Sequence, residues 1–258
     1  PSLLCNYRCL TCSQGRIRDE KIKQVKARAR ERQTRGLLMT RQNMEKFIGD
    51  LSENGVKGII FTGAGEPLTN PHTLFGMRCA KECGLSVGLF TNGALLTKDK
   101  VVEILTIEPN FVRVSLDAGT PLIYRLFHGL EDDRCFAQVL DNLRYMVQHK
   151  LELAKRTEIS ANVVVTPLNI YDCVEVAKRV KEIVSEFSGG IRKISYKPVI
   201  NYKTGRAYSQ RTQLALDYVK SDDRLRKFYE IYRDLFYTDR QLPGWFFEEV
   251  FAEVEQKV

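Results

Sequence analysis

Short apolar runs alternate with amphipathic stretches along most of this chain, and no other feature constrains its fold as strongly. Runs of four to eight residues rich in Val, Ile and Phe are typical of buried strands, whereas the stretches between them have helical spacing. Strands are expected at residues 57–61, 86–91, 111–116, 158–165 and 191–196, with a sixth at Leu3 and Leu4. Helices are expected at about residues 40–54, 70–83, 97 onward, 132–150 and 169–187, and Thr40, Thr97 and Asn169 are expected at the starts of the first, third and last of them as caps. Repeated strand–helix units predict a parallel sheet, either a barrel or an open doubly wound sheet.

Three cysteines with the spacing C-x3-C-x2-C, Cys5, Cys9 and Cys12, open the chain. Three thiolates can hold three irons of a cubane cluster and leave the fourth iron open, whereas a structural zinc site needs four ligands. The nearest histidine, His72, lies beyond a predicted strand, and no second Cys-x2-Cys pair occurs. The pattern favours an iron–sulfur cluster, and a zinc-binding interaction module remains the alternative from another class.

A glycine-rich motif follows one strand–helix unit later, in the sequence Phe61-Thr62-Gly63-Ala64-Gly65-Glu66-Pro67. Together with the cysteines it makes the chain resemble the radical S-adenosylmethionine (radical SAM) enzymes over about residues 3–200, with Ala64 where the family commonly has Gly. Further motifs stand in the family's order, namely Thr91-Asn92-Gly93, Ser115-Leu116-Asp117 and Asn162-Val163-Val164-Val165-Thr166.

The resemblance implies an α/β fold, a partial (β/α)6 TIM-type barrel of parallel strands that is open on one side. Residues 1–200 would form this barrel, and residues 201–258 an aromatic-rich helical C-terminal extension. Because the chain begins without Met and close to its cysteines, we expect it to be a piece of a longer protein.

The resemblance also implies the chemistry. A single 4Fe-4S cluster on Cys5, Cys9 and Cys12 would cleave S-adenosylmethionine reductively, and the resulting 5′-deoxyadenosyl radical would abstract a hydrogen atom from a substrate. The cluster would receive its electron from a flavodoxin or ferredoxin type of donor.

Cofactor contacts follow from the same resemblance. The motif residues Gly63, Ala64, Gly65, Glu66 and Pro67 would approach the methionine part, with Glu66 near its amino group. Ser115 would contact the ribose or the carboxylate group and Asn162 the ribose, although each could instead satisfy local backbone groups at a strand end. Weaker candidates are Thr91, Asn92, Asp117, Arg125 and His128.

The net charge of +8 is concentrated in a basic segment, residues 15–41, which carries ten basic and three acidic residues. Such a segment could attract an anionic substrate or a nucleic acid, or it could be a solvated helix face. We rank a small-molecule or natural-product substrate first, and RNA or a nucleotide second because of this segment. A peptide ranks third, because no cysteine follows Cys173 to hold the additional clusters of many peptide-modifying relatives. Seven cysteines, an odd number, predict a reducing, cytoplasmic location, and no apolar run reaches the roughly 18 residues of a membrane span.

Overall fold

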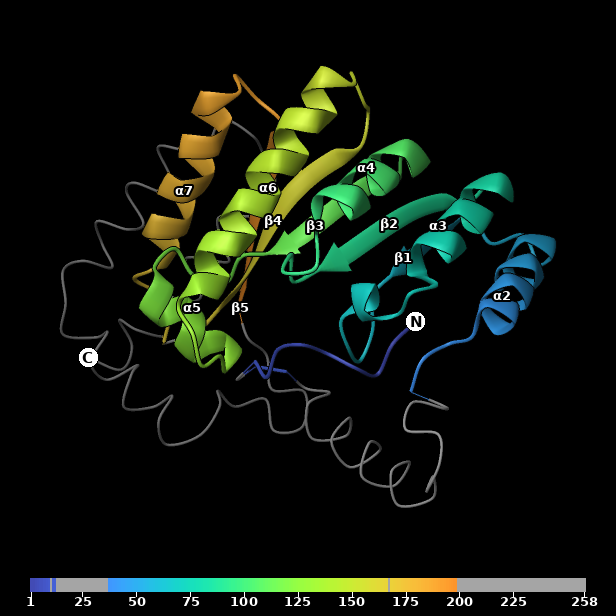
Figure 1. Ribbon diagram of the computed structural model, residues 1–258, viewed down its shortest axis with the longest axis horizontal. Helices are drawn as coiled ribbons and strands as arrows, with labels where there is room; N and C mark the ends of the chain where they lie inside the picture. The colour runs from blue at the N-terminus through green and yellow to red at the C-terminus, as the bar shows by residue number, and fades with distance from the viewer. Residues whose placement is uncertain (10, 13–36, 167, 199–258) are drawn as a thin grey trace, which may run out of the picture.

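The computed structural model describes residues 1–9, 11–12, 37–166 and 168–198, in which five parallel strands form one sheet (Figure 1). In chain order these strands are β1 (Gly58–Phe61), β2 (Ser86–Thr91), β3 (Phe111–Ser115), β4 (Glu158–Val165) and β5 (Ile191–Pro198). Each strand pairs in parallel with the next strand along the chain. This α/β fold is consistent with a partial TIM-type barrel, so the predicted fold class is confirmed.

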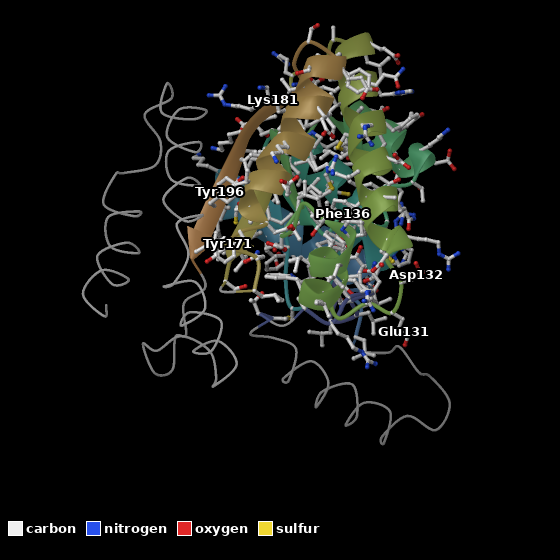
Figure 2. All side chains as sticks on the ribbon, turned by 90° about the vertical axis from the view of Figure 1, so that its left-hand side faces the viewer. Glu131, Asp132, Phe136, Tyr171, Lys181 and Tyr196 are labelled. Carbon is white, nitrogen blue, oxygen red and sulfur yellow. The ribbon has the colours of Figure 1, made fainter. Side chains whose placement is uncertain are left out.

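Helices connect the strands in sequence. They are α2 (Arg41–Glu53), the 3-10 turn η1 (Pro67–Thr69), α3 (Thr73–Glu82), α4 (Lys98–Ile107), α5 (Pro121–His128), α6 (Arg134–Glu152) and α7 (Cys173–Glu186). Figures 1 and 2 agree that α6 and α7 lie side by side. Figure 2 also shows Tyr196 of β5 close to α7, where its hydroxyl group donates a hydrogen bond to the carbonyl oxygen of Cys173 at 2.9 Å.

The two faces of the sheet differ in character. Every second residue points toward the helices and is fully buried, including Leu89, Val112, Val114, Ile159 and Val163. The opposite face, which we call the inner face, carries the residues between them. Its first member, Ile60, is 48% exposed, and polar residues follow on β3 and β4. The core therefore lies between the sheet and its helices, and the polar residues of the inner face are candidates for binding.

The sixth strand expected at Leu3 and Leu4 is not part of this sheet. Ser2 forms only an isolated antiparallel bridge with Leu38, and the Leu3 N–H donates to the carbonyl oxygen of Leu37 at 2.8 Å. The Leu4 carbonyl oxygen accepts from the Glu66 N–H at 2.8 Å. The stub is thus held by the segment before α2 and by the loop after β1, instead of by a neighbouring strand of the sheet.

Two helix assignments also differ from the sequence-based expectation. Helix α5 was not expected; Pro121 begins it, and it ends before Gly129, whose φ of 62° is left-handed. Asn169 does not cap α7, which begins at Cys173 after Asp172. The Asn169 side chain donates instead to the carbonyl oxygens of Asp117 and Val164, so it fastens the loop after β4 to the end of β3. Thr40 and Thr97 do cap their helices as expected.

Most of the basic segment and the whole extension at residues 201–258 lie outside the described residues, so the domain division stays a prediction. Among the helices that the structure describes, none is long and apolar enough to cross a membrane.

Candidate functional site

The cysteine loop, residues 5–12, lies beyond the carboxyl ends of the strands, where the N-terminal segment passes the arrowheads of β2 and β3 (Figure 1). Connecting segments hold it there. The Asn92 Nδ2 after β2 donates to Asn6 Oδ1 at 2.8 Å, and the Arg8 N–H donates to the carbonyl oxygen of His128 at 2.9 Å. Because this end of a parallel α/β sheet is where active sites form, the loop marks the candidate site.

The loop itself is a compact turn. The Cys12 N–H donates to the carbonyl oxygen of Cys9 at 3.2 Å, and the Tyr7 N–H donates to Cys5 Sγ at 3.4 Å. Cys5 and Cys9 pack against the core. Within the described residues, no three His, Cys, Asp or Glu side chains are arranged to hold one metal ion. Three thiol groups on one turn are the donor set of an iron–sulfur cluster.

The glycine-rich loop packs on Leu4, the residue that leads into this turn. A Cβ atom on Gly65 would lie 2.1 Å from the carbonyl oxygen of Leu4, so only glycine fits this contact. A Cβ atom on Gly63 would make only an ordinary contact, 3.8 Å from the carbonyl oxygen of Ser2, but the φ of 149° disfavours other residues. Pro67 is buried and begins η1, which fixes the direction of the loop. The backbone of the glycine-rich loop is thus in contact with Leu4, which directly precedes the cysteine loop.

Glu66 is buried and engaged by the chain itself. Its Oε1 accepts from the Leu68 N–H at 3.1 Å and from Thr91 Oγ1 at 2.8 Å, and its Oε2 accepts from the Asn92 N–H at 2.8 Å. Burial raises the pKa of Glu66, and these hydrogen bonds oppose the rise. Thr91 and Asn92 therefore connect Glu66 to the cysteine loop, a link that the sequence did not reveal.

His128 bridges the cysteine loop and the end of β3. Its Nδ1 lies 3.1 Å from Cys9 Sγ, and its Nε2 lies 3.6 Å from Asp117 Oδ2. The ring packs against those of Tyr7 and Tyr124, with centroids 5.0 Å and 4.3 Å away. Burial lowers the pKa of His128 to about 3, so the ring is neutral and carries one N–H. Two distant weak candidates, Asp117 and His128, are thus brought together beside Cys9.

The remaining candidates divide into two groups. Ser115 and Asn162 are paired across β3 and β4 on the inner face, and the buried Asn162 Oδ1 has no hydrogen-bond partner in the described part of the chain. An unpaired buried oxygen is suited to receive a ligand's donor. Arg125 behaves differently, because its Nε lies 2.7 Å from Asp133 Oδ1 and pairs α5 with the start of α6.

Sequence reasoning missed several residues of the site. Asn6 and Tyr7 stand inside the cysteine motif, and the Tyr7 hydroxyl lies 3.3 Å from that of Tyr124. Burial raises the pKa of Tyr7 to about 12.

Comparison with known proteins identifies the family. A model described as the Radical SAM superfamily matches residues 1–180. The chain belongs to the radical SAM superfamily. It is therefore an enzyme whose cofactors are a 4Fe-4S cluster and S-adenosylmethionine, and the match decides against the zinc-binding module.

Individual relatives are distant. The chain is 32% identical over 92 residues to the AdoMet-dependent heme synthase of Methanosarcina barkeri, covering 36% of this chain and 26% of that protein. It is 26% identical over 146 residues to the PqqA peptide cyclase of Bradyrhizobium diazoefficiens, covering 55% and 35%. The crystal structure of Streptococcus suis SuiB aligns with a TM-score of 0.57 at 16% identity, covering 91% of this chain and 45% of SuiB. The matched segments thus span only about a quarter to a third of the curated relatives.

The pH dependence of stability tests the environment of Asp117. Burial raises the pKa of this carboxyl from 3.8 to about 7, against a hydrogen bond from the Val164 N–H. Since the folded protein holds this proton up to a higher pH than the unfolded chain, Asp117 contributes stability at low pH that is lost as the pH rises toward 7.

Asp117→Asn removes this dependence. The free energy of unfolding of the variant minus that of the wild type should therefore increase from pH 4 to pH 8, by about 4 kcal/mol at most. Comparing the two proteins isolates Asp117, because the lowered pKa of His128 acts in the opposite direction in both. Urea denaturation across this pH range measures the difference, and the exposed Asp50→Asn is the control. A difference that did not change with pH would contradict the buried, protonated state of Asp117.

Proposed function

We propose that Cys5, Cys9 and Cys12 hold the 4Fe-4S cluster of this enzyme and that residues 63–67 bind the methionine part of S-adenosylmethionine. When bound, these cofactors supply a 5′-deoxyadenosyl radical that abstracts a hydrogen atom from a small-molecule or natural-product substrate. The observation that carries this proposal is the direct backbone contact of Gly65 and Glu66 with Leu4, the residue before Cys5, on the carboxyl edge of the sheet.

The chain's own residues would orient the cofactor. Glu66 is held rigidly by three donors, and its carboxylate oxygens keep lone pairs that can accept from an ammonium group. The unpaired Asn162 Oδ1 and its neighbour Ser115 would receive ribose hydroxyl groups. Arg125 is the weakest of the proposed contacts, because Asp133 already engages it.

His128 would adjust the midpoint potential of the cluster. Because Cys9 binds iron as a thiolate and the neutral ring has one N–H, we assign that proton to Nδ1, from which it is donated to Cys9 Sγ. Hydrogen bonds to cluster sulfur atoms stabilise the reduced cluster, which carries one more negative charge, and so make its midpoint potential less negative.

Replacement of His128 by Phe keeps an aromatic ring among Tyr7 and Tyr124 but removes the donor. We expect the midpoint potential of the cluster to become more negative, on the order of 40 mV, which corresponds to one hydrogen bond of about 1 kcal/mol. A redox titration followed by electron paramagnetic resonance measures it, with His149→Phe on α6 as the control. An unchanged midpoint potential in His128→Phe would contradict the proposed hydrogen bond from His128 to Cys9 Sγ.

An electron donor of the flavodoxin or ferredoxin type and a cytoplasmic location complete the proposal. The odd number of cysteines and the sensitivity of an iron–sulfur cluster to oxidation support a reducing compartment. A second candidate, modification of RNA or a nucleotide, is favoured by the ten basic residues of the basic segment.

Deuterium transfer distinguishes a small-molecule substrate from RNA. The reconstituted, reduced protein is mixed with S-adenosylmethionine and with either the small-molecule or the RNA fraction of cells grown in heavy water. We expect deuterated 5′-deoxyadenosine with the small-molecule fraction alone, since hydrogen abstraction carries the substrate's deuterium into that product. Deuterium transfer from the RNA fraction alone would replace the first candidate with the second.

A further inference from the structure

A cross-strand row of side chains on the inner face has no role in the site described above. Phe90 is in register with Arg113, Arg113 with Ser160, and Ser160 with Lys193, so four neighbouring strands each contribute one residue. Directly paired residues of a sheet share a face and lie within about 5.5 Å at their Cβ atoms. We call this set the Arg113 row.

Arg113 lacks the partner that a partly buried arginine normally has. Its guanidinium carbon lies 5.2 Å from the centroid of the Phe90 ring and 5.0 Å from that of Phe111. Its Nε is buried without a hydrogen bond, and no ion pair to it occurs in the described part of the chain. Because buried polar atoms are generally hydrogen-bonded, the unpaired Nε leaves this guanidinium able to bind an anion.

Ser160 adds a second unsatisfied group beside it. The residue is 0% exposed, and its hydroxyl oxygen has no hydrogen-bond partner among the described residues. A buried hydroxyl without a partner is costly, whereas a ligand oxygen next to Arg113 would satisfy it. The arrangement therefore offers a guanidinium and a hydroxyl donor side by side.

The charge balance around the row is positive. Lys193 Nζ lies 3.9 Å from Glu158 Oε1, and the same carboxylate is 3.2 Å from Arg192 Nε. The single carboxylate of Glu158 thus lies near two cations, and it forms no ion pair with Arg113. Lys197, further along β5, adds a cation on the same face.

The position of the row relates it to the reaction. Ser115, Asn162 and Ser195 are in register two residues nearer the carboxyl ends, which is where we propose the ribose contacts. On the other side, the Phe111 ring covers Gly88, where a Cβ atom would lie 2.2 Å from the ring. The row therefore lies between the proposed cofactor contacts and an aromatic floor.

We propose that the Arg113 row binds a carboxylate or phosphate group of the substrate, which makes the substrate an anionic molecule. This inference rests on the proposed function, because it places the substrate next to the cofactor contacts. The planar fork of Arg113 suits two oxygens of one anionic group, and Ser160 and Lys193 supply the remaining donors.

Anion binding by the full chain tests the proposal without any turnover. Citrate and inorganic phosphate are titrated separately into the protein by calorimetry, and potassium chloride at equal ionic strength is the reference. We expect saturable binding of at least one anion. Arg113→Met should weaken it about 10- to 100-fold, Arg113→Lys and Ser160→Ala less, and Arg156→Met, at a 93% exposed side chain, not at all. The anion that binds more tightly identifies the group as carboxylate or phosphate.

Two outcomes would overturn the proposal. One is anion binding no stronger than the chloride reference, or equal in Arg113→Met and the wild type. The other is a large loss of thermal stability in Arg113→Met without anion binding to the wild type, which would mean that another part of the chain supplies the partner of Arg113. In either case, formation of 5′-deoxyadenosine by the same preparation would leave the proposed function standing, so the two failures are distinguishable.

Discussion

A Cys9→Ala protein is expected to contain almost no iron or sulfide after anaerobic reconstitution, whereas the wild type should hold about four irons per chain. Cys9 is the middle thiol of the loop, and its Sγ contacts His128. Burial raises the pKa of this thiol, so cluster binding must displace a proton that the metal-free protein holds firmly. Two remaining cysteines cannot supply the three thiolates that the cluster needs.

Cys83→Ala is the matched control, because Cys83 is exposed at the end of α3. Iron and sulfide analysis, together with the broad visible absorbance of the cluster, gives the result. Full iron content in Cys9→Ala would remove the assignment of this loop as the cluster site.

The Gly65→Ala substitution is expected to separate the two motifs. The new methyl group would lie 2.1 Å from the carbonyl oxygen of Leu4, and the 2.8 Å hydrogen bond between the Glu66 N–H and that oxygen would be lost. Both clashing groups are backbone, so neither can rotate away. We expect a loss of about 3 kcal/mol of unfolding free energy and loss of S-adenosylmethionine binding. The cysteine loop should be displaced as well, which reasoning from the sequence would not anticipate.

Gly49→Ala is the matched control for this variant. Gly49 lies within α2 with no atom within 4 Å of an added Cβ, so alanine there should raise stability by about 0.5–1 kcal/mol. Urea denaturation and equilibrium dialysis with labelled S-adenosylmethionine provide the two measurements. Wild-type stability and binding in Gly65→Ala would contradict the packing of Gly65 on Leu4.

The sequence predicted the parts of the fold that depend on local patterns. The strands are regular apolar runs, and the caps Thr40 and Thr97 stand at the helix starts that they stabilise. Helix α5 was missed because its eight residues are too short for a periodic pattern. Leu3 and Leu4 read as a strand because they are apolar, but their backbone groups bond to Leu37 and Glu66.

The site was predictable only in outline. Motifs that follow parallel strands meet at one edge, so contact between the cysteine loop and residues 63–67 could be expected. The pairing of His128 with Cys9 joins residues 119 positions apart, and no local pattern encodes it. Likewise, Arg113 looks like an ordinary strand residue until the structure shows Ser160 beside it and, among the described residues, no carboxylate paired with it.

Reductive cleavage of S-adenosylmethionine tests the central claim most directly. The full chain is reconstituted anaerobically with iron and sulfide, reduced with dithionite and mixed with S-adenosylmethionine, and 5′-deoxyadenosine is quantified by chromatography. The structure and the family predict this product in the wild type and its absence in Cys9→Ala. A wild-type protein that carried a complete cluster and bound S-adenosylmethionine, yet released no 5′-deoxyadenosine with any electron donor, would contradict the account.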